Sequence, residues 1–567
     1  MPPIPPRKAA LALMLCLAGN AAANPPPATP QAGSAAHAMV AAANPLAVAA
    51  GLRVLKAGGS AVDAAVAVQA VLGLVEPQSS GLGGGAFLTY YDAKSHRVTA
   101  YDGREVAPAG ASPRQFLGAD GRPLPPFAAM QGGIASGVPG AIAMLEMAQK
   151  DHGRLPWRGL FGDARALALK GFVVSPRLAS AIRSGAPGAA TADAHRYFSR
   201  ADGTPLQAGD RLANPAYAAS LDAIAQKGAA GLLQGPLAAG IIASLQAAPL
   251  PSTMTLADLA AYRPRRAEAL CRPYRVYAIC TPGAPSGGPA VQEALGLLAH
   301  TDIAARRPDD EKAWFLFAQA SRLAYADRDR YEGDPTFVRF PQAGLLAPAY
   351  LADRAKLIGE VAGPVSWGQP QGAPTPGADH TQEPGGTTHF VIVDARGNAV
   401  SMTTTVENVF GNGRMVGGFF LNNQLTDFSF SPSDADGTPA ANAVAPGKRP
   451  RSSMAPTIVL GAGGRLVAAT GSPGGSSIIA YTLKSLVALL DWHMRPQEAA
   501  ALPNLVARGG SFTADPFPQP IMAGLAARAL PLQTARGEAS GIHSILVVNG
   551  RYVGGADPRR EGQARGF

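Results

Sequence analysis

The sequence predicts a large α/β protein, and its composition, helical segments and strand-rich runs each support that class. Hydrophobic residues make up 47% and charged residues 16% of the 567 residues, which excludes a long disordered chain. Ala- and Leu-rich helical segments separated by Gly and Pro fill roughly residues 140–360, whereas β-rich runs follow residue 386. At about 150 residues per domain, this length suits two to four units or one large α/β body.

The N-terminus has the layout of a secretory signal peptide. Two basic residues precede an apolar stretch over 9–19, and alanines at 21–23 offer a cleavage site. The apolar stretch is too short to span a bilayer, although a retained membrane anchor is the alternative interpretation. We expect a signal peptide over 1–23, a flexible leader over 24–37, and a periplasmic or secreted protein that has no membrane association after cleavage.

Two helices are predicted after the leader. Asn44 caps a helix over 45–57, which has Pro at its first position and two glycines after its end. Ser60 and Asp63 open a second helix that runs to Glu76 and is apolar on nearly every side. Such a helix belongs in the interior of a large body.

Charge and motif content exclude several function classes. The net charge of +10 is spread over the whole chain, so it is a poor argument for a nucleic-acid partner. We find no P-loop, no His-Glu-x-x-His zinc site and no Gly-x-Ser-x-Gly nucleophile elbow. The glycines of 81–86 superficially fit a dinucleotide fingerprint, but they follow a helix rather than a strand, and we interpret them as a backbone turn.

Two cysteines remain in the expected mature chain, Cys271 and Cys280. They flank residues 272–275, which we interpret as a turn. An oxidising compartment permits a disulfide between them, and two buried thiols are the alternative, because the sequence does not fix the register of the pair.

A segment poor in regular structure precedes the strand-rich part. Residues 361–384 include nine Pro or Gly residues and show no strong periodicity, so we expect an exposed, flexible segment that ends at two further glycines.

The next two β-rich runs form a predicted hairpin around a three-residue loop, 395–397, with Gly at its end. Centred on Arg396, this hairpin places Thr387 directly opposite Thr405 on one face. Alternation adds Thr403 and Glu407 to that face. One hydroxyl at the end of a flexible segment therefore faces a second hydroxyl and a carboxylate.

This arrangement suits a threonine nucleophile at a chain end. A hydroxyl needs a base, and a free α-amino group supplies one when threonine is the first residue. Thr387 gains that amine only after cleavage between Gly386 and Thr387, which its own hydroxyl could carry out on the preceding carbonyl. By composition alone, Thr403 to Thr405 is also compatible with an ordinary Thr-rich strand.

Residues 387–411 resemble the small-subunit signature of the γ-glutamyltransferases (glutathione hydrolases), a family of N-terminal-nucleophile hydrolases. Matches in family order run from about residue 38 to about 560. The other matching motifs are Asp63-Ala64-Ala65, Glu76-Pro77, Ser80-Gly81-Leu82-Gly83-Gly84-Gly85, Gly137-Val138-Pro139-Gly140, Pro285-Ser286-Gly287-Gly288, Leu421-Asn422-Asn423-Gln424, Lys448-Arg449-Pro450-Arg451-Ser452-Ser453-Met454, Gly471-Ser472-Pro473-Gly474-Gly475 and Asp557-Pro558-Arg559.

The resemblance implies an αββα sandwich built from two autoproteolytically generated subunits, a large one over 38–386 and a small catalytic one over 387–567. Thr387 is then the nucleophile, and its new α-amine is the base. Thr405 orients Thr387 through a hydrogen bond. Gly474 and Gly475 offer backbone N–H groups to the tetrahedral oxyanion. No metal or organic cofactor is implied.

The implied substrates are glutathione and other γ-glutamyl compounds, with water, amino acids or peptides as acceptors. A γ-glutamyl group carries an α-carboxylate and an α-ammonium, so its pocket needs both signs of charge. The resemblance assigns the carboxylate to Arg104, Ser452 and Ser453. It assigns the ammonium to Asp427, helped by Glu407 and Gln424.

Two departures and two alternatives accompany this assignment. Glu407 stands where many members have Asn, and residues 428–451, where some relatives carry a lid, contain no Tyr or Trp. A cephalosporin-acylase-like enzyme that cleaves a glutaryl amide is the first alternative, but glutaryl lacks the ammonium that Asp427 would bind. An exported binding protein with a degenerate site is the second.

Overall fold

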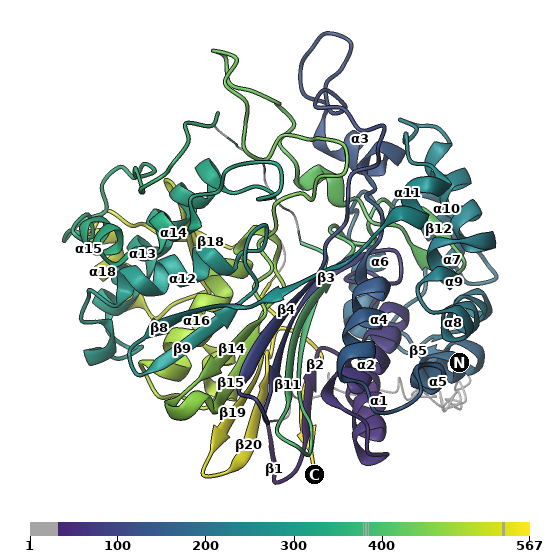
Figure 1. Cartoon of the computed structure of the whole chain (residues 1–567), viewed down its shortest axis with the longest axis horizontal. Coiled ribbons are helices and arrows are strands. Elements are labelled where there is room, and N and C mark those ends of the chain that lie inside the picture. Colours follow the sequence, from purple (N-terminus) through teal and green to yellow (C-terminus); the bar gives the residue numbers. More distant parts are fainter. Residues whose placement is uncertain (1–31, 378, 380, 382, 384, 536–538) are drawn as a thin grey trace, which may run out of the picture.

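The computed structural model describes residues 32–377, 379, 381, 383, 385–535 and 539–567. Two seven-stranded antiparallel sheets lie face to face at its centre, and helices cover the outer face of each (Figure 1). The expected signal peptide and the first part of the leader lie outside the described residues.

The first sheet holds the predicted hairpin at its centre. Its strand order is β21 (Gln563–Gly566), β2 (Met39–Ala42), β10 (Thr387–Val393), β11 (Ala399–Thr405), β3 (Gly85–Asp92), β4 (Arg97–Gly103) and β7 (Arg265–Glu268). β10 therefore has a hydrogen-bonded neighbour on each side, so cleavage before its first residue leaves the strand held in the sheet.

The second sheet combines strands from both ends of the chain with strands from its middle. Its order is β1 (Gly33–Ala35), β20 (Arg551–Ala556), β19 (His543–Val548), β15 (Leu466–Gly471), β14 (Thr457–Leu460), β9 (Tyr277–Thr281) and β8 (Leu270–Tyr274). β10 packs on β19 and β11 packs on β15, which aligns the centres of the two sheets.

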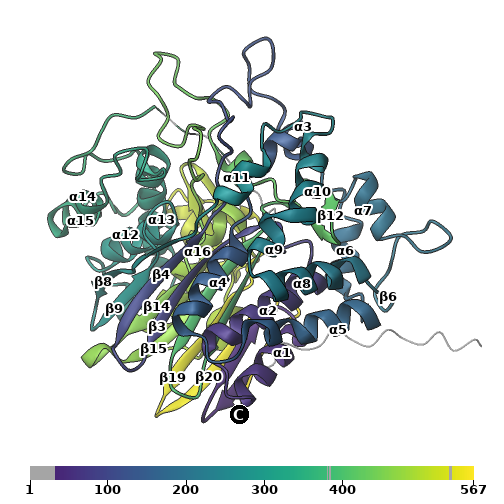
Figure 2. The same cartoon turned by 45° about the vertical axis from the view of Figure 1, so that its right-hand side comes forward.

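Two helical layers complete the sandwich, and Figure 2 shows them from a second direction. The helices α1 (Pro45–Lys56), α2 (Ala61–Val75) and α4 (Ala141–His152) contact the first sheet, and α5 (Gly162–Lys170) and α8 (Pro215–Lys227) pack outside them. The helices α12 (Gly288–Leu298), α16 (Ile478–Leu490) and α17 (Pro496–Ala501) contact the second sheet, and α13 (Glu311–Tyr331), α15 (Pro348–Ala355) and α18 (Gln519–Ala527) extend this layer outward.

Shorter elements lie around these four layers. The helices are α3 (Pro126–Gln131), α6 (Pro176–Ile182), α7 (Ala192–Tyr197), α9 (Ala230–Leu233), α10 (Gly235–Gln246), α11 (Leu256–Ala261) and α14 (Gln342–Leu345). The strand pairs and ribbons are β5 (Phe172–Val173) with β6 (Arg211–Leu212), β12 (Met415–Val416) with β13 (Phe419–Phe420), and β16 (Leu505–Arg508) with β17 (Ser511–Ala514) and β18 (Gln533–Thr534).

The N-terminal helices form as their caps predict. The side chain of Asn44 accepts a hydrogen bond from the N–H of Leu46, and Ser60 and Asp63 form a reciprocal capping box on α2. Every residue of α2 is buried, because this helix lies between the first sheet and the other helices of its layer. The all-round apolar pattern is thereby explained.

The hairpin of β10 and β11 has the predicted register. Thr387 pairs with Thr405 and His389 with Thr403. Gly397 turns the chain at a φ of 83°, a conformation that favours glycine, and the carboxylate of Asp394 accepts hydrogen bonds from two N–H groups of the loop. The turn therefore fixes which side chains face the second sheet.

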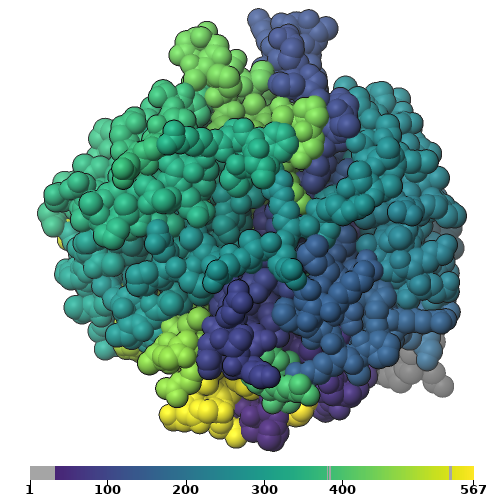
Figure 3. Space-filling view, viewed as in Figure 1, coloured from purple at the N-terminus to yellow at the C-terminus, as the bar shows by residue number. Residues whose placement is uncertain are grey.

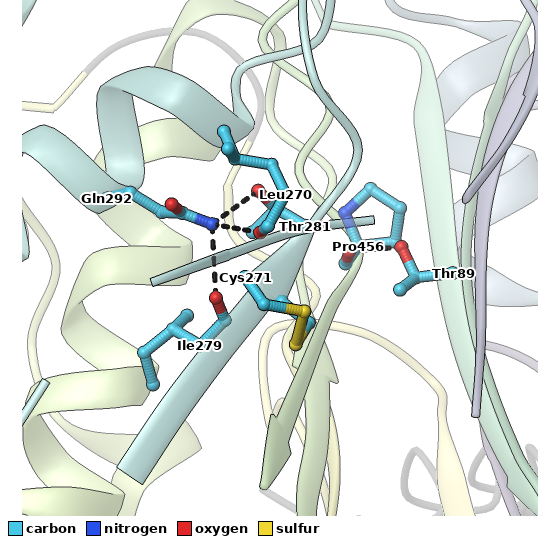
Figure 4. Close-up of a disulfide and its surroundings, with 8 residues drawn as sticks. Thr89, Leu270, Cys271, Ile279, Thr281, Gln292 and Pro456 are labelled. Carbon is cyan, nitrogen blue, oxygen red and sulfur yellow. Dashed lines mark hydrogen bonds between the residues drawn. A yellow bond between two sulfur atoms is a disulfide. The ribbon is translucent and has the colours of Figure 1, made fainter. Parts of the chain in front are cut away.

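The two cysteines form a disulfide between β8 and β9, two strands that sequence analysis did not predict (Figure 4). The chain turns at Arg275 and Val276 rather than over 272–275, because Arg272 and Pro273 belong to β8. The side-chain amide of Gln292 donates to the carbonyl oxygens of Leu270 and Ile279 and to the Thr281 hydroxyl, which anchors this hairpin to α12.

Two expectations about irregular segments need correction. The leader was expected to be flexible up to residue 37, but 33–35 form β1, since they extend the second sheet beside β20. The described residues of 361–386 contain no helix or strand, as expected, yet Asp379 and Glu383 are buried rather than exposed, because both carboxylates contact arginines. Within the described ranges, no helix is both long and apolar enough to cross a membrane.

Candidate active site

The predicted nucleophile lies at the first position of β10, where it meets the last position of β11. The hydroxyl of Thr387 donates to Oγ1 of Thr405 over 3.0 Å. The N–H of Glu407 donates to the same oxygen over 2.8 Å, and the Thr405 hydroxyl itself donates to the carbonyl of Gly386 over 3.1 Å. Thr405 thus connects the hydroxyl of Thr387 to the carbonyl of the preceding residue, Gly386.

Two buried histidines, one on β10 and one on β19, lie next to this face of the hairpin. Nδ1 of His389 lies 2.9 Å from the hydroxyl of Thr403, the pair directly behind Thr387 and Thr405. Burial lowers the pKa of His389 well below its ordinary value and that of His543, its neighbour on β19, to about 4. Both imidazoles are therefore neutral at physiological pH, which avoids placing a charge between the sheets.

The predicted site residues converge on one small cavity. Its volume is about 20 Å³, which is room for about one water molecule. The lining residues are Arg104, Glu383, Thr387, Thr405, Glu407, Gln424, Asp427, Ser452, Ser453, Met454, Gly475 and Ile478. Nine of the ten residues predicted for catalysis or substrate binding are among them, and Gly474 is adjacent to Gly475.

The two charges predicted to bind opposite ends of a substrate are paired with each other. Nη2 of Arg104 lies 2.5 Å from Oδ2 of Asp427, and both side chains are buried. The guanidinium also donates to the carbonyl oxygens of Pro450 and Arg451, at 3.2 and 2.6 Å. Burial raises the pKa of Asp427, although Arg104 opposes that shift. A zwitterionic ligand would have to compete with this ion pair.

Three acceptor oxygens in this cavity have no donor among the described residues. They are Oε1 of Glu407, Oε1 of Gln424 and Oδ1 of Asp427. The side-chain amide of Gln424 donates to the other Asp427 oxygen over 2.6 Å, so the residues that carry these acceptors lie together. Burial and the neighbouring Asp427 carboxylate raise the pKa of Glu407 well above its ordinary value. The empty site therefore favours a proton on this pair, and a bound cation would oppose it.

One of the two predicted serines, Ser453, contacts a carboxylate that the sequence analysis did not include. The hydroxyl of Ser453 donates to Oε2 of Glu383 over 2.5 Å. Ser452 accepts from the N–H of Met454 over 3.1 Å. Glu383 also contacts two buried arginines, and these opposite charges hold its pKa at about 2 although burial alone would raise it. No motif marked Glu383, because it lies in the Pro- and Gly-rich segment.

The predicted oxyanion residues lie between β15 and α16. Gly474 has a φ of 136° and Gly475 a φ of 56°, both in the region that favours glycine. Gly475 begins the short helix η6 (Gly475–Ser477) and lines the cavity with Thr387. A Cβ on Gly474 would lie 2.5 Å from the ring of Tyr481, so both position and backbone angle require glycine there.

Residues 428–451 lie over this end of the molecule and are anchored on the first half of the chain. Phe430 stacks on Phe116 with ring centroids 4.6 Å apart, and Phe428 joins the same apolar cluster. Figure 3 shows this stretch in light green and the segment around Phe116 in blue, projecting at the same end. Apolar contacts thus connect this stretch to the loop around Phe116.

Within the described part of the chain, no group of three or more His, Cys, Asp or Glu side chains has an arrangement that could hold a metal ion. The polar groups of the cavity are instead acceptors and guanidinium donors, which are suited to a small charged organic ligand.

Two stacked antiparallel sheets between two helical layers, with a threonine at the head of a central strand, are the fold of the N-terminal-nucleophile hydrolases. Comparisons with known proteins identify the family. The chain belongs to the gamma-glutamyltranspeptidase family, whose sequence model matches residues 47–567.

Curated relatives match over nearly the whole chain. The glutathione hydrolase proenzyme of Bacillus subtilis (strain 168) is 35% identical over 544 residues, covering 93% of this chain and 91% of its own. The acylase ACY 1 proenzyme of Pseudomonas sp. (strain SE83) is 33% identical over 539 residues, covering 93% of each. The relatives therefore include both a glutathione hydrolase and an acylase.

The solved structures include an acylase with the same architecture. Cephalosporin acylase from Bacillus halodurans superposes with a TM-score of 0.84 at 26% identity, covering 96% of this chain and 99% of that one. The αββα sandwich implied by the sequence resemblance is thereby confirmed, whereas the choice between γ-glutamyl and glutaryl amides depends on the residues of the cavity.

Proposed function

We propose that this chain is a self-processing γ-glutamyl transferase and hydrolase that cleaves glutathione and other γ-glutamyl amides. The observation that carries the proposal is the group of three acceptors without donors, on Glu407, Gln424 and Asp427. An ammonium offers three N–H donors and no acceptor, so it matches these oxygens in both number and charge. Family membership and the threonine pair of the central hairpin support the reaction type.

Maturation is proposed to begin with Thr387. Its hydroxyl oxygen attacks the carbonyl carbon of Gly386, the bond to the Thr387 nitrogen breaks, and the hydroxyl proton passes to the released amine. The product is an ester between Gly386 and the Thr387 oxygen, and water hydrolyses it to a free carboxylate and a free hydroxyl. The Thr405 hydroxyl supports this step, because it already donates to the carbonyl that becomes an oxyanion.

Turnover is proposed to reuse the same hydroxyl. The new α-amine accepts the proton of Thr387 as its oxygen attacks the γ-carbonyl carbon, and the amine then protonates the leaving nitrogen. The N–H groups of Gly474 and Gly475 stabilise the tetrahedral oxyanion. Water or the amino group of an amino acid or peptide then attacks the γ-glutamyl ester, which regenerates Thr387.

Ligand orientation follows from charge. The α-ammonium takes the three acceptors and replaces the proton shared by Glu407 and Asp427. The α-carboxylate takes Arg104 and the hydroxyls of Ser452 and Ser453, since a guanidinium fork suits that anion. The mature protein is then a heterodimer of a large subunit that includes β1 and ends at Gly386 and a small subunit over 387–567, exported by the N-terminal signal.

The acylase alternative is weakened by the same three oxygens. A glutaryl group has no ammonium, so Glu407 and Asp427 would keep their shared proton and the Gln424 oxygen would stay without a donor, at a cost of about 1–3 kcal/mol for that oxygen. Comparing kcat/KM for a γ-glutamyl anilide and a glutaryl anilide decides between the two, and we expect the γ-glutamyl substrate to be preferred by at least about a hundredfold.

The maturation step is tested by Thr387→Ala. This variant removes both the attacking group and the later nucleophile, so we expect one uncut chain without turnover of the anilide. N-terminal sequencing of the smaller band from the unmutated protein should begin at Thr387. A normal small subunit in the variant would contradict self-cleavage. Exhaustive chelation should leave turnover of the mature protein intact.

A further inference from the structure

Glu383 lies in the segment that the proposed cleavage separates from the nucleophile, yet its side chain lines the candidate substrate cavity. Its Oε1 lies 2.6 Å from Nη2 of Arg328 and 3.4 Å from Nε of Arg451. Its Oε2 accepts the hydroxyl of Ser453, and its carbonyl accepts the N–H of Ser476 over 3.0 Å. Four contacts thus hold one residue of an otherwise irregular segment.

We propose that Glu383 positions the segment for cleavage and, in the uncut chain, occupies the place of the substrate's α-carboxylate. This inference rests on the proposed function, since it takes Ser453 as part of the carboxylate site. Glu383 is a positioning residue, because it touches neither the Gly386 carbonyl nor the Thr387 hydroxyl in the contacts described above.

The positioning role follows from chain length. Glu383 precedes Gly386 by three residues, which span at most about 10 Å when extended. Anchoring the carboxylate in the cavity and the carbonyl on Ser476 therefore restricts where Gly386 lies. At that point Thr405 and the N–H of Val406 meet the Gly386 carbonyl at 3.1 and 3.4 Å. A loose segment would reach this geometry less often.

The occupancy role follows from charge and space. The remaining cavity is about 20 Å³, far less than a γ-glutamyl group needs, and the Glu383 side chain is one of the groups that line it. Glu383 presents a carboxylate to Ser453, as the α-carboxylate of a substrate would. Cleavage after Gly386 gives this segment a free end, and Glu383 can then leave the site to the ligand.

The two arginines that contact Glu383 have other carboxylate partners. A variant that lacks Glu383 should therefore still fold, which makes the proposal testable. Arg328 also contacts Glu332 at 3.1 Å and Asp329 at 3.3 Å. Arg451 also contacts Asp379 at 3.2 Å. Neither arginine is left buried without a carboxylate when Glu383 is removed.

The first experiment measures cleavage of the full chain by pulse-chase on denaturing gels. We expect Glu383→Ala to slow the appearance of the small subunit roughly tenfold to a hundredfold, and Glu383→Gln to slow it less, because the amide still accepts from Ser453. The matched control is Glu360→Gln, an exposed glutamate before the same segment, which should cleave at the unmutated rate. Unmutated kinetics in Glu383→Ala would overturn the positioning role.

The second experiment measures binding of L-glutamate by titration calorimetry. Uncut Thr387→Ala protein should bind at least about tenfold more weakly than the mature enzyme, and adding Glu383→Ala should restore binding to within a few-fold. No gain in the double variant, while mature enzyme binds, would overturn the occupancy role. If mature enzyme itself neither binds L-glutamate nor cleaves the anilide, the proposed function fails instead, and the cleavage kinetics still decide the positioning role.

Discussion

At the scale of single residues, the candidate site depends on which buried oxygens have donors. Arg104 and Asp427 satisfy each other, whereas one oxygen each on Glu407, Gln424 and Asp427 is left without a donor among the described residues. Other buried oxygens among the described residues also lack donors, so what distinguishes these three is that they line one cavity where a ligand can supply the donors. The grouping of these three oxygens in one cavity is the most specific indication of substrate chemistry in the described part of the molecule.

Replacing Asp427 tests that statement. Cleavage of the chain needs no γ-glutamyl group, so Asp427→Ala should still give two subunits. Its kcat/KM on a γ-glutamyl anilide should fall roughly 30-fold to several-thousand-fold, because one partner of a desolvated charge pair is lost. A glutaryl anilide has no ammonium and should be affected much less. Equal losses on both substrates would mean that Asp427 shapes the cavity rather than recognising the amine.

Proton release on binding is a second consequence at this scale. The pKa of Glu407 is raised in the empty site, so an incoming ammonium should displace the proton shared with Asp427. The Kd for L-glutamate should therefore decrease as the pH rises through the raised pKa of Glu407, by at most about tenfold per pH unit for one proton.

Calorimetry in buffers of different ionisation enthalpy counts the protons that binding releases. Glu407→Gln provides the control, because an amide cannot release a proton, and its Kd should change little over the same range. Equal proton release by this variant and the unmutated protein would assign the effect to another group.

At the scale of elements, helix caps and turns that lie far from the cavity hold the helices and strands in position. The carboxylate of Asp63 closes the capping box of α2 and also accepts the N–H groups of Arg154 and Leu155 and the side-chain amide of Gln149. One buried side chain thus joins α2 to the end of α4 and to the loop after it. Asp63 belongs to a motif shared with the family, but its contacts are structural.

Asp63→Ala should therefore lower the free energy of unfolding without changing the chemistry. One buried and three partly buried N–H groups lose their acceptor, so we expect a loss of about 3 kcal/mol in urea unfolding. The kcat/KM of the folded fraction should stay unchanged. Asp120→Ala removes an exposed aspartate with one local hydrogen bond and should cost less than about 0.5 kcal/mol. A selective loss of kcat/KM at full stability would place Asp63 in the site instead.

At the scale of the whole molecule, the stacked sheets determine how stability depends on pH. His543 is neutral in the folded protein, where burial lowers its pKa to about 4, but its pKa returns to about 6.5 on unfolding. The unfolded state therefore binds the extra proton, and stability is lost as the pH falls from about 6.5 to about 4. The loss from this residue amounts to about 3 kcal/mol.

Urea unfolding at several pH values measures the direction and the size of this change in the free energy of unfolding. Substituting His543→Gln removes the titration, so the stability of the variant should fall less steeply over the same pH range. Carboxylates with lowered pKa, such as Glu383, add their own losses at lower pH. The comparison with the variant separates the histidine contribution, and parallel curves for the two proteins would contradict it.

Sequence reasoning reached the hairpin and the site because local rules and motifs determine both. A short loop with Gly397 sets the pairing of Thr387 with Thr405, and capping residues set the two N-terminal helices. Strands β8 and β9 were missed, since Arg272 and Pro273 of the edge strand β8 have the composition of a turn, and without β8 the cysteines had no fixed register. Glu383 was missed for a different reason: its partners are 55 and 70 residues away, and no local pattern records such contacts.

The interleaving of strands has a consequence for what happens after the chain is cut. Each sheet takes strands from both sides of the Gly386–Thr387 bond, so neither product can form a complete sheet alone. The uncut chain folds as one molecule at a rate independent of concentration, whereas separated products would have to find each other in solution. Maturation is then a one-way event: the mature enzyme is preserved by slow unfolding rather than by refolding, and its lifetime depends on the barrier that keeps the two sheets closed.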